Sequence, residues 1–232
     1  MGFFDKLFKK KICSVCGNEI GLFGKRKVED GNICKECEGM LSPWFDERRS
    51  STVAEIAEQI EYRKNNGELI RKFRITRTLG GDVKKVHIDE AAKKFIITSA
   101  SDIIKDNPDI IDFSQVMGCS LDIVDRQTEV KRRDKDGKMV SYEPKRYRCF
   151  YDFYIIINVN HPYFGDMRFR LNTSSVETTS ENGAHKNKLP NPKFDHNYKK
   201  YEDIGNEIVE YMTEACNRNI IEPVSGIQGD GR

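Results

Sequence analysis

Long hydrophobic runs are missing from this sequence. No stretch approaches the roughly 20 apolar residues that a membrane-spanning helix requires, and no apolar segment near the start precedes a small-residue cleavage site. An excess of one charge sign is missing as well, because 39 Lys and Arg stand against 37 Asp and Glu. We therefore expect a soluble, cytoplasmic protein without the overall positive field of a highly basic nucleic-acid binder.

Signatures of catalysis are also missing. The sequence contains no glycine-rich phosphate loop of the G-x-x-x-x-G-K type, no H-E-x-x-H and no G-x-S-x-G. An enzyme needs a nucleophile, a base and a site that holds them, and the few histidines are scattered. They are His87, His161, His185 and His196. We expect no enzymatic activity and no small-molecule substrate.

Cysteines are the most informative residues that are present. Four of the seven form two pairs with Cys-x-x-Cys spacing, Cys13 with Cys16 and Cys34 with Cys37, separated by 17 residues. Two such turns supply four thiolates in the tetrahedral arrangement that zinc prefers. Because all four ligands come from protein, no coordination position stays open for a substrate. We expect a structural Zn²⁺ ion.

Disulfides and a redox dithiol are the competing interpretations of these pairs. A disulfide framework is typical of secreted chains, and no secretion signal is visible here. A redox Cys-x-x-Cys usually occurs singly and needs no matching second pair. The remaining cysteines, Cys119, Cys149 and Cys216, are interpreted as small buried hydrophobic residues.

The first 11 residues form a short amphipathic segment. Four apolar side chains share one helical face and are followed by three lysines, in the order Phe3, Phe4, Leu7, Phe8, Lys9, Lys10 and Lys11. Such a segment can lie on an anionic membrane surface, where the apolar face and the lysines both add affinity. The alternative is that the phenylalanines dock onto the rest of the protein.

Residues 41–67 are expected to hold a connecting helix, and residues 68–218 an antiparallel β domain. Thr52 and Glu55 have the spacing of a capping box, and Asn65–Gly67 is expected to end the helix. A helix over 199–217 closes the domain, after a polar loop at 172–197 and before a tail at 219–232. Strands are predicted over 69–78, 83–89, 93–98, 117–130, 147–159 and 166–171, with a short segment at 110–113.

Two resemblances follow from these patterns. Cys13-Ser-Val-Cys16-Gly17 and Asp30-Gly31-Asn32-Ile33-Cys34-Lys35-Glu36-Cys37 resemble an uncharacterised bacterial and phage family with an N-terminal zinc finger or ribbon. The remainder, with Ile111-Asp112-Phe113-Ser114-Gln115-Val116 before a strand, looks like a bacterial pleckstrin-homology-like domain. The resemblance implies an α+β fold. A zinc ribbon or treble-clef-like module at 12–40 would precede a partly open antiparallel barrel or sandwich with a C-terminal helix.

A non-enzymatic binding or adaptor function is expected from this organisation. A protein partner is the first expectation, followed by an anionic membrane at whose inner face the protein would be peripheral. Nucleic acid is the alternative, because the first 27 residues contain seven basic and two acidic side chains. A second basic cluster is a candidate anion contact: Lys131, Arg132, Arg133, Lys145, Arg146 and Arg148.

Overall fold

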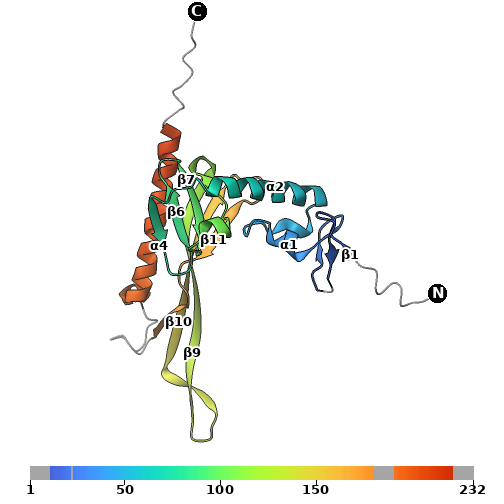
Figure 1. The fold of residues 1–232 in the computed structure, drawn as a ribbon. Helices are drawn as coiled ribbons and strands as arrows, with labels where there is room; N and C mark the ends of the chain where they lie inside the picture. The colour runs from blue at the N-terminus through green and yellow to red at the C-terminus, as the bar shows by residue number, and fades with distance from the viewer. Residues whose placement is uncertain (1–10, 22, 180–190, 222–232) are drawn as a thin grey trace, which may run out of the picture. The chain divides into compact units, whose positions relative to one another are not determined.

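The computed structural model describes residues 11–21, 23–179 and 191–221. The chain divides into two compact units (Figure 1). The first unit comprises the chain up to Arg74 together with Ala100–Ile110 and His161–Gly165, and the second comprises the remainder. The expected modules at 12–40, 41–67 and 68–218 were consecutive, whereas two segments from within the third belong to the first unit.

Short hairpins build the start of the first unit. Strand β1 (Lys11–Ile12) pairs with β2 (Glu19–Ile20), and β3 (Arg26–Lys27) pairs with β4 (Asn32–Ile33). Helix α1 (Lys35–Gly39) and the 3₁₀ turn η1 (Glu47–Arg49) follow. The core of this unit is formed by buried apolar side chains from two elements. Val28 and Ile33 come from the second hairpin, and Ile56 and Ile60 come from the next helix.

That helix, α2 (Val53–Ile70), begins as predicted and ends later than predicted. Thr52 Oγ1 accepts from the Glu55 N–H at 3.3 Å, while Glu55 Oε2 accepts from the Thr52 N–H at 2.7 Å, which confirms the capping box. The predicted end at Asn65–Gly67 is wrong. The helix continues because Asn66 is buried and bonded to distant chain, and it therefore does not act as a stop signal.

Two segments that are distant in sequence complete the first unit. One of them contains helix α3 (Ile103–Asp106). The residues that follow this helix form hydrogen bonds with the Asn66 side chain. The Asn66 amide donates to Asn107 Oδ1 at 2.7 Å and to the Pro108 carbonyl at 2.8 Å, and its Oδ1 accepts from the Ile110 N–H at 3.0 Å. The side chain thus pairs with groups on three residues of that segment.

The first sheet of the second unit is antiparallel, in the order β5-β6-β7-β8. The predicted strand from 69 to 78 is wrong in its first part, because Leu69 and Ile70 form the last turn of α2 and pairing begins at Arg77. A 3₁₀ turn η2 (Phe113–Gln115) follows the sheet. The strands are β5 (Arg77–Gly80), β6 (Lys85–Asp89), β7 (Lys94–Thr98) and β8 (Ile111–Asp112).

The second sheet is built around one long strand. Strand β10 (Met139–Val159) pairs with β9 (Val116–Arg133) along one edge, and these two extend as a long hairpin (Figure 1). Its other edge is shared by β11 (Asp166–Arg170) and β12 (Val176–Thr179).

Strand β12 lies inside the polar loop that was expected at 172–197. Asn172 is fully buried between β11 and β12, where its Oδ1 accepts from the Phe153 N–H at 3.0 Å and its amide donates to the carbonyls of Tyr151 and Ser174. The Asn172 side chain thus supplies hydrogen bonds to the β10 backbone at the point between β11 and β12 where neither of these two strands pairs with it. The loop also contains the 3₁₀ turn η4 (Pro192–Phe194), and residues 180–190 lie outside the described chain.

Helix α4 (His196–Ile221) packs against β5, β9 and β10. Ile208 and Met212, four residues apart on the helix, are fully buried. Gly205 allows a close approach at the crossing, because a Cβ there would lie 2.5 Å from Leu121 Cδ1 and that side chain would have to shift. The fold is therefore a mixed α+β fold with a C-terminal helix. Neither four-stranded sheet closes on itself within the described residues, so a pleckstrin-homology-like barrel is not established. No described helix is both long and apolar enough to cross a membrane.

Candidate metal centre and the basic surface beside it

The four paired cysteines meet at one point in the first unit. Their Sγ atoms all lie within 4.8 Å of one another, with 3.8 Å between Cys13 and Cys37 and 3.7 Å between Cys16 and Cys34. A tetrahedral zinc ion with Zn–S bonds of about 2.3 Å holds its sulfurs about 3.8 Å apart. A disulfide needs about 2.05 Å, so these sulfurs are spaced for a shared metal ion.

The local backbone aims these sulfurs inward. After the first pair, Gly17 adopts φ +75° and its N–H donates to the Cys13 carbonyl at 2.9 Å, a turn that favours glycine. Cys34 caps helix α1, so its Sγ accepts from the Cys37 N–H at 3.4 Å. The Cys34 N–H in turn points at Cys13 Sγ at 3.3 Å. Backbone donors thus surround the sulfurs, as suits thiolate ligands.

The thiol pKa values show why this cluster needs a cation. At Cys13, burial raises the pKa, but backbone N–H groups of Cys16, Cys34 and Val15 outweigh it and lower the value to about 6. At Cys37, burial and then the neighbouring thiols raise the pKa. Four thiolates in one place therefore require a metal ion to offset their mutual repulsion. The donor set and its spacing fit structural zinc.

The other cysteines stay apart from this centre. Cys149 is 1% exposed, and burial raises its pKa. Burial likewise raises the pKa of Cys119 to about 12. Among residues 11–21, 23–179 and 191–221, the four-cysteine cluster is the only group of His, Cys, Asp and Glu with metal-binding spacing. Cys149, which is buried, and Cys119, which is partly buried, thus have the character of protonated thiols.

A basic concavity lies on the same module. Its volume is about 620 Å³, and it is lined by Lys25, Arg26, Lys27, Arg48 and Arg49. We call this hollow the basic concavity. Strand β3 and turn η1 supply four of these residues, and the Arg48 guanidinium ties the two elements together by donating to the Lys27 carbonyl at 2.7 Å. The basic residues counted in the first 27 positions of the sequence include Lys25, Arg26 and Lys27, but Arg48 and Arg49 were not part of that count.

One carboxylate offsets this set of cations. Glu38 on α1 accepts from Arg26 Nε at 2.5 Å with one oxygen and lies 3.2 Å from Arg48 Nε with the other. The side chains of Lys25, Lys27 and Arg49 form no ion pair with any carboxylate in the described part of the chain. The concavity therefore keeps a local excess of positive charge.

Lys11 extends this positive surface. The pKa of Lys25 lies below its usual value because the Lys11 side chain contacts it, and because the charges of Lys11 and then Lys27 lie nearby. Lys11, the first residue of β1, is the one residue of the predicted amphipathic segment that belongs to the described residues. The other six, Phe3, Phe4, Leu7, Phe8, Lys9 and Lys10, lie outside the described residues.

The second predicted basic cluster is spread along the β9–β10 hairpin. Arg132 and Arg146 stack on Tyr142, at 5.8 and 4.3 Å from the ring centroid. Arg148 is engaged by Glu177 through two hydrogen bonds of 2.6 and 2.7 Å. The other three, Lys131, Arg133 and Lys145, are exposed. None of these six residues lines the basic concavity, and their role stays a prediction.

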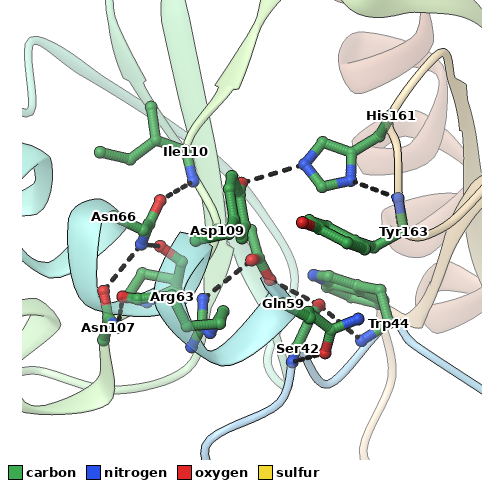
Figure 2. Close-up of polar contacts among 12 residues, drawn as sticks. Ser42, Trp44, Gln59, Arg63, Asn66, Asn107, Asp109, Ile110, His161 and Tyr163 are labelled. Atoms are coloured by element: carbon green, nitrogen blue, oxygen red, sulfur yellow. Dashed lines mark hydrogen bonds and ion pairs between the residues drawn. The ribbon is translucent and has the colours of Figure 1, made fainter. Parts of the chain in front are cut away.

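A buried polar network in the first unit was missed entirely (Figure 2). Asp109 is fully buried between Arg63 and Ser42, and its two oxygens accept from them at 2.8 Å each. Beside it, His161 Nε2 lies 3.0 Å from the Tyr62 hydroxyl, across 99 residues of sequence. Such partners leave no local pattern, so no sequence signal identifies them.

Comparison with known families gives a match only in the N-terminal part of the chain. Residues 11–59 match a family described as a domain of unknown function, DUF4428. The matched range holds all four metal-binding cysteines, the basic concavity and the first part of α2. No curated protein and no solved structure gives a significant match to the chain.

Proposed function

We propose that this protein is a non-enzymatic binding protein whose zinc-stabilised module recognises a phosphate-bearing polyanion. The basic concavity carries this proposal, because five cationic side chains share one hollow and a single carboxylate from the described residues pairs with them. Guanidinium groups bind phosphate oxygens through paired hydrogen bonds, and lysines add point charges. Lys25, Lys27 and Arg49 are the residues that would contact the ligand.

Zinc supports this surface from beneath. Val28 and Ile33 on the β3–β4 hairpin are fully buried against the metal-binding cysteines and against α2. Asp30, at the tip of that hairpin, accepts from the Val53 N–H at 2.7 Å. A core this small depends on its metal, so loss of zinc would separate the strand and the turn that form the concavity.

Two sources of such a polyanion are an anionic membrane and a nucleic acid. The concavity holds only Lys and Arg, and no Asn or Gln that would read base edges. Recognition would therefore follow phosphate density and would weaken as salt concentration rises. Either source agrees with the proposal, and binding assays with each distinguish them.

An adaptor also needs a second binding surface, and we assign it to the second unit. Strand β9 pairs with β10 on one side, and no described strand pairs with its other side. A free edge of this kind accepts an extended peptide from a protein partner. The pleckstrin-homology-like interpretation is supported by two antiparallel sheets and a C-terminal helix, and it remains part of the proposal.

Isothermal titration of the zinc-loaded full chain with inositol hexakisphosphate tests the proposal. Replacing Lys27→Glu together with Arg49→Glu should weaken binding by at least about tenfold, which is about 1.4 kcal/mol at 25 °C. These two positions are chosen because Arg26 and Arg48 also hold Glu38. The matched control, Lys131→Glu with Arg133→Glu, should bind normally. Equal binding by both variants, or none by the parent chain, would overturn the proposal.

A further inference from the structure

We propose that the turn at Gly21–Gly24 inserts Phe23 into an anionic bilayer, so that the polyanion is a phospholipid surface. This inference rests on the proposed function and names its ligand. Phe23 is 93% exposed, although aromatic side chains of this size normally bury most of their surface. An exposed apolar ring beside cationic side chains is a combination that favours contact with an anionic lipid surface.

The turn presents Phe23 outward in a defined position. The Gly24 N–H donates to the Gly21 carbonyl at 3.0 Å, which closes the turn at its base. The Phe23 carbonyl accepts from the Arg26 guanidinium at 3.2 Å. The apolar tip is therefore fixed directly to a residue that lines the basic concavity.

This arrangement matches the layers of a membrane surface. A bilayer offers negatively charged headgroups and, immediately beneath them, acyl chains. Arg26 and Lys25 would stay at the level of the headgroups while Phe23 enters the boundary with the acyl chains. A nucleic acid offers phosphates without an apolar phase, although an aromatic ring can stack on its bases.

The chain supplies a matched control for Phe23. Phe194 on η4 is 88% exposed, belongs to the second unit and is distant in sequence from the residues that line the basic concavity, which belong to the first unit. Phe194→Ser therefore removes an equally exposed ring from a different place. If exposed phenylalanines bound lipid regardless of their surroundings, the two substitutions would have equal effects.

Vesicle sedimentation of the zinc-loaded full chain tests the inference. The parent protein should sediment with vesicles of phosphatidylcholine and phosphatidylserine, and not with phosphatidylcholine alone. Phe23→Ser should reduce vesicle binding by about tenfold or more, since the loss of one inserted ring removes most of the apolar contribution. Phe194→Ser should leave it unchanged. Undiminished sedimentation of Phe23→Ser would overturn the inference.

Two further readouts separate this inference from the proposed function. Binding of inositol hexakisphosphate should survive Phe23→Ser, because that ligand uses only the cations. If the parent chain fails to bind inositol hexakisphosphate, the proposed function itself is wrong. If Phe23→Ser abolishes binding to a single-stranded oligonucleotide and spares vesicle binding, the ring stacks on bases and the membrane inference is overturned.

Fluorescence locates the ring directly. Trp44 is the single tryptophan of the chain, so Trp44→Phe with Phe23→Trp places the only indole at the tip of the turn. Its emission should shift to shorter wavelength with phosphatidylserine vesicles and should be quenched by brominated lipid. The same indole at position 194 should show neither change. An unshifted, unquenched signal from position 23 would contradict insertion.

Discussion

Arg63 on α2 donates to Asp109, 46 residues further along the chain, at 2.8 Å, and water is almost excluded from the pair. The Asp109 side chain is fully buried, and that of Arg63 is 9% exposed. Ser42 donates to the second Asp109 oxygen, so both oxygens are satisfied. A charge buried in this way is tolerated only while its partners are present.

Asp109→Ala should destabilise the first unit by about 3–5 kcal/mol, because it leaves the Arg63 charge buried without a partner. Urea unfolding followed by Trp44 fluorescence measures this in the correct unit. Glu61→Ala, which breaks the exposed Lys64–Glu61 pair on the same helix, should cost less than about 1 kcal/mol. Similar costs for the two substitutions would show that burial of Asp109 does not matter.

Acid should weaken the first unit through His161. Burial lowers the pKa of His161, although the charge of Asp109 opposes this. The Tyr163 N–H points at Nδ1 at 3.3 Å, which makes Nε2 the donor to the Tyr62 hydroxyl and favours the neutral ring. The unfolded chain therefore binds the proton first. Stability is complete above the unfolded pKa of about 6.5 and is lost as pH falls through it towards the folded value.

His161→Gln provides the comparison for this pH dependence. The urea midpoint reported by Trp44 should fall less in the variant than in the parent chain when the pH is lowered below about 6.5. His87, whose pKa is lowered by burial and then by Lys85, lies in the second unit and should not affect this probe. An identical fall in the two proteins would remove His161 as the responsible group.

Cys34→Ser should abolish zinc binding and unfold the module around it. The parent chain should contain about one zinc ion per molecule by atomic absorption, and the variant close to none. Because Ile56 and Ile60 pack on the cysteine cluster, the beginning of α2 should lose protection from hydrogen exchange. Cys119→Ser should retain zinc. Full zinc content in Cys34→Ser would contradict the assigned ligand set.

Asn172→Ala should destabilise the second unit by about 1–3 kcal/mol. The substitution leaves the Phe153 N–H and two carbonyls unpaired in a fully buried position. Urea unfolding followed by circular dichroism measures the loss. Asn158→Ala, at an exposed position of the same strand β10, should cost within about 0.5 kcal/mol. A neutral Asn172→Ala would mean that the join between β11 and β12 needs no side chain.

Local patterns predicted what local chemistry decides. The cysteine spacing gave the metal centre, because a Cys-x-x-Cys turn brings two sulfurs together regardless of the remaining fold. Thr52 and Glu55 gave the start of α2, since both halves of a capping box lie within one turn. The C-terminal helix α4 was predicted as well, over 199–217, because its apolar side chains recur with the helical period.

Distant partners explain what the sequence did not predict. Asn66 was read as a helix end because its bonds to the segment at 107–110 cannot be seen locally. Asn172 was placed in a polar loop for the same reason. The basic concavity could be predicted only in part, because Arg48 and Arg49 are distant from Lys25–Lys27 in the sequence and are brought beside them by the fold. Polar residues with tertiary partners look like turn residues when they are considered alone.

The most direct test of the central claim is the titration of inositol hexakisphosphate into the full chain with zinc bound and after its removal by a chelator. A zinc-stabilised basic concavity predicts saturable binding to the zinc-loaded protein that weakens with salt, and loss of that binding when zinc is removed. Equal affinity with and without zinc would contradict the account, because the ligand would then bind somewhere other than the zinc module.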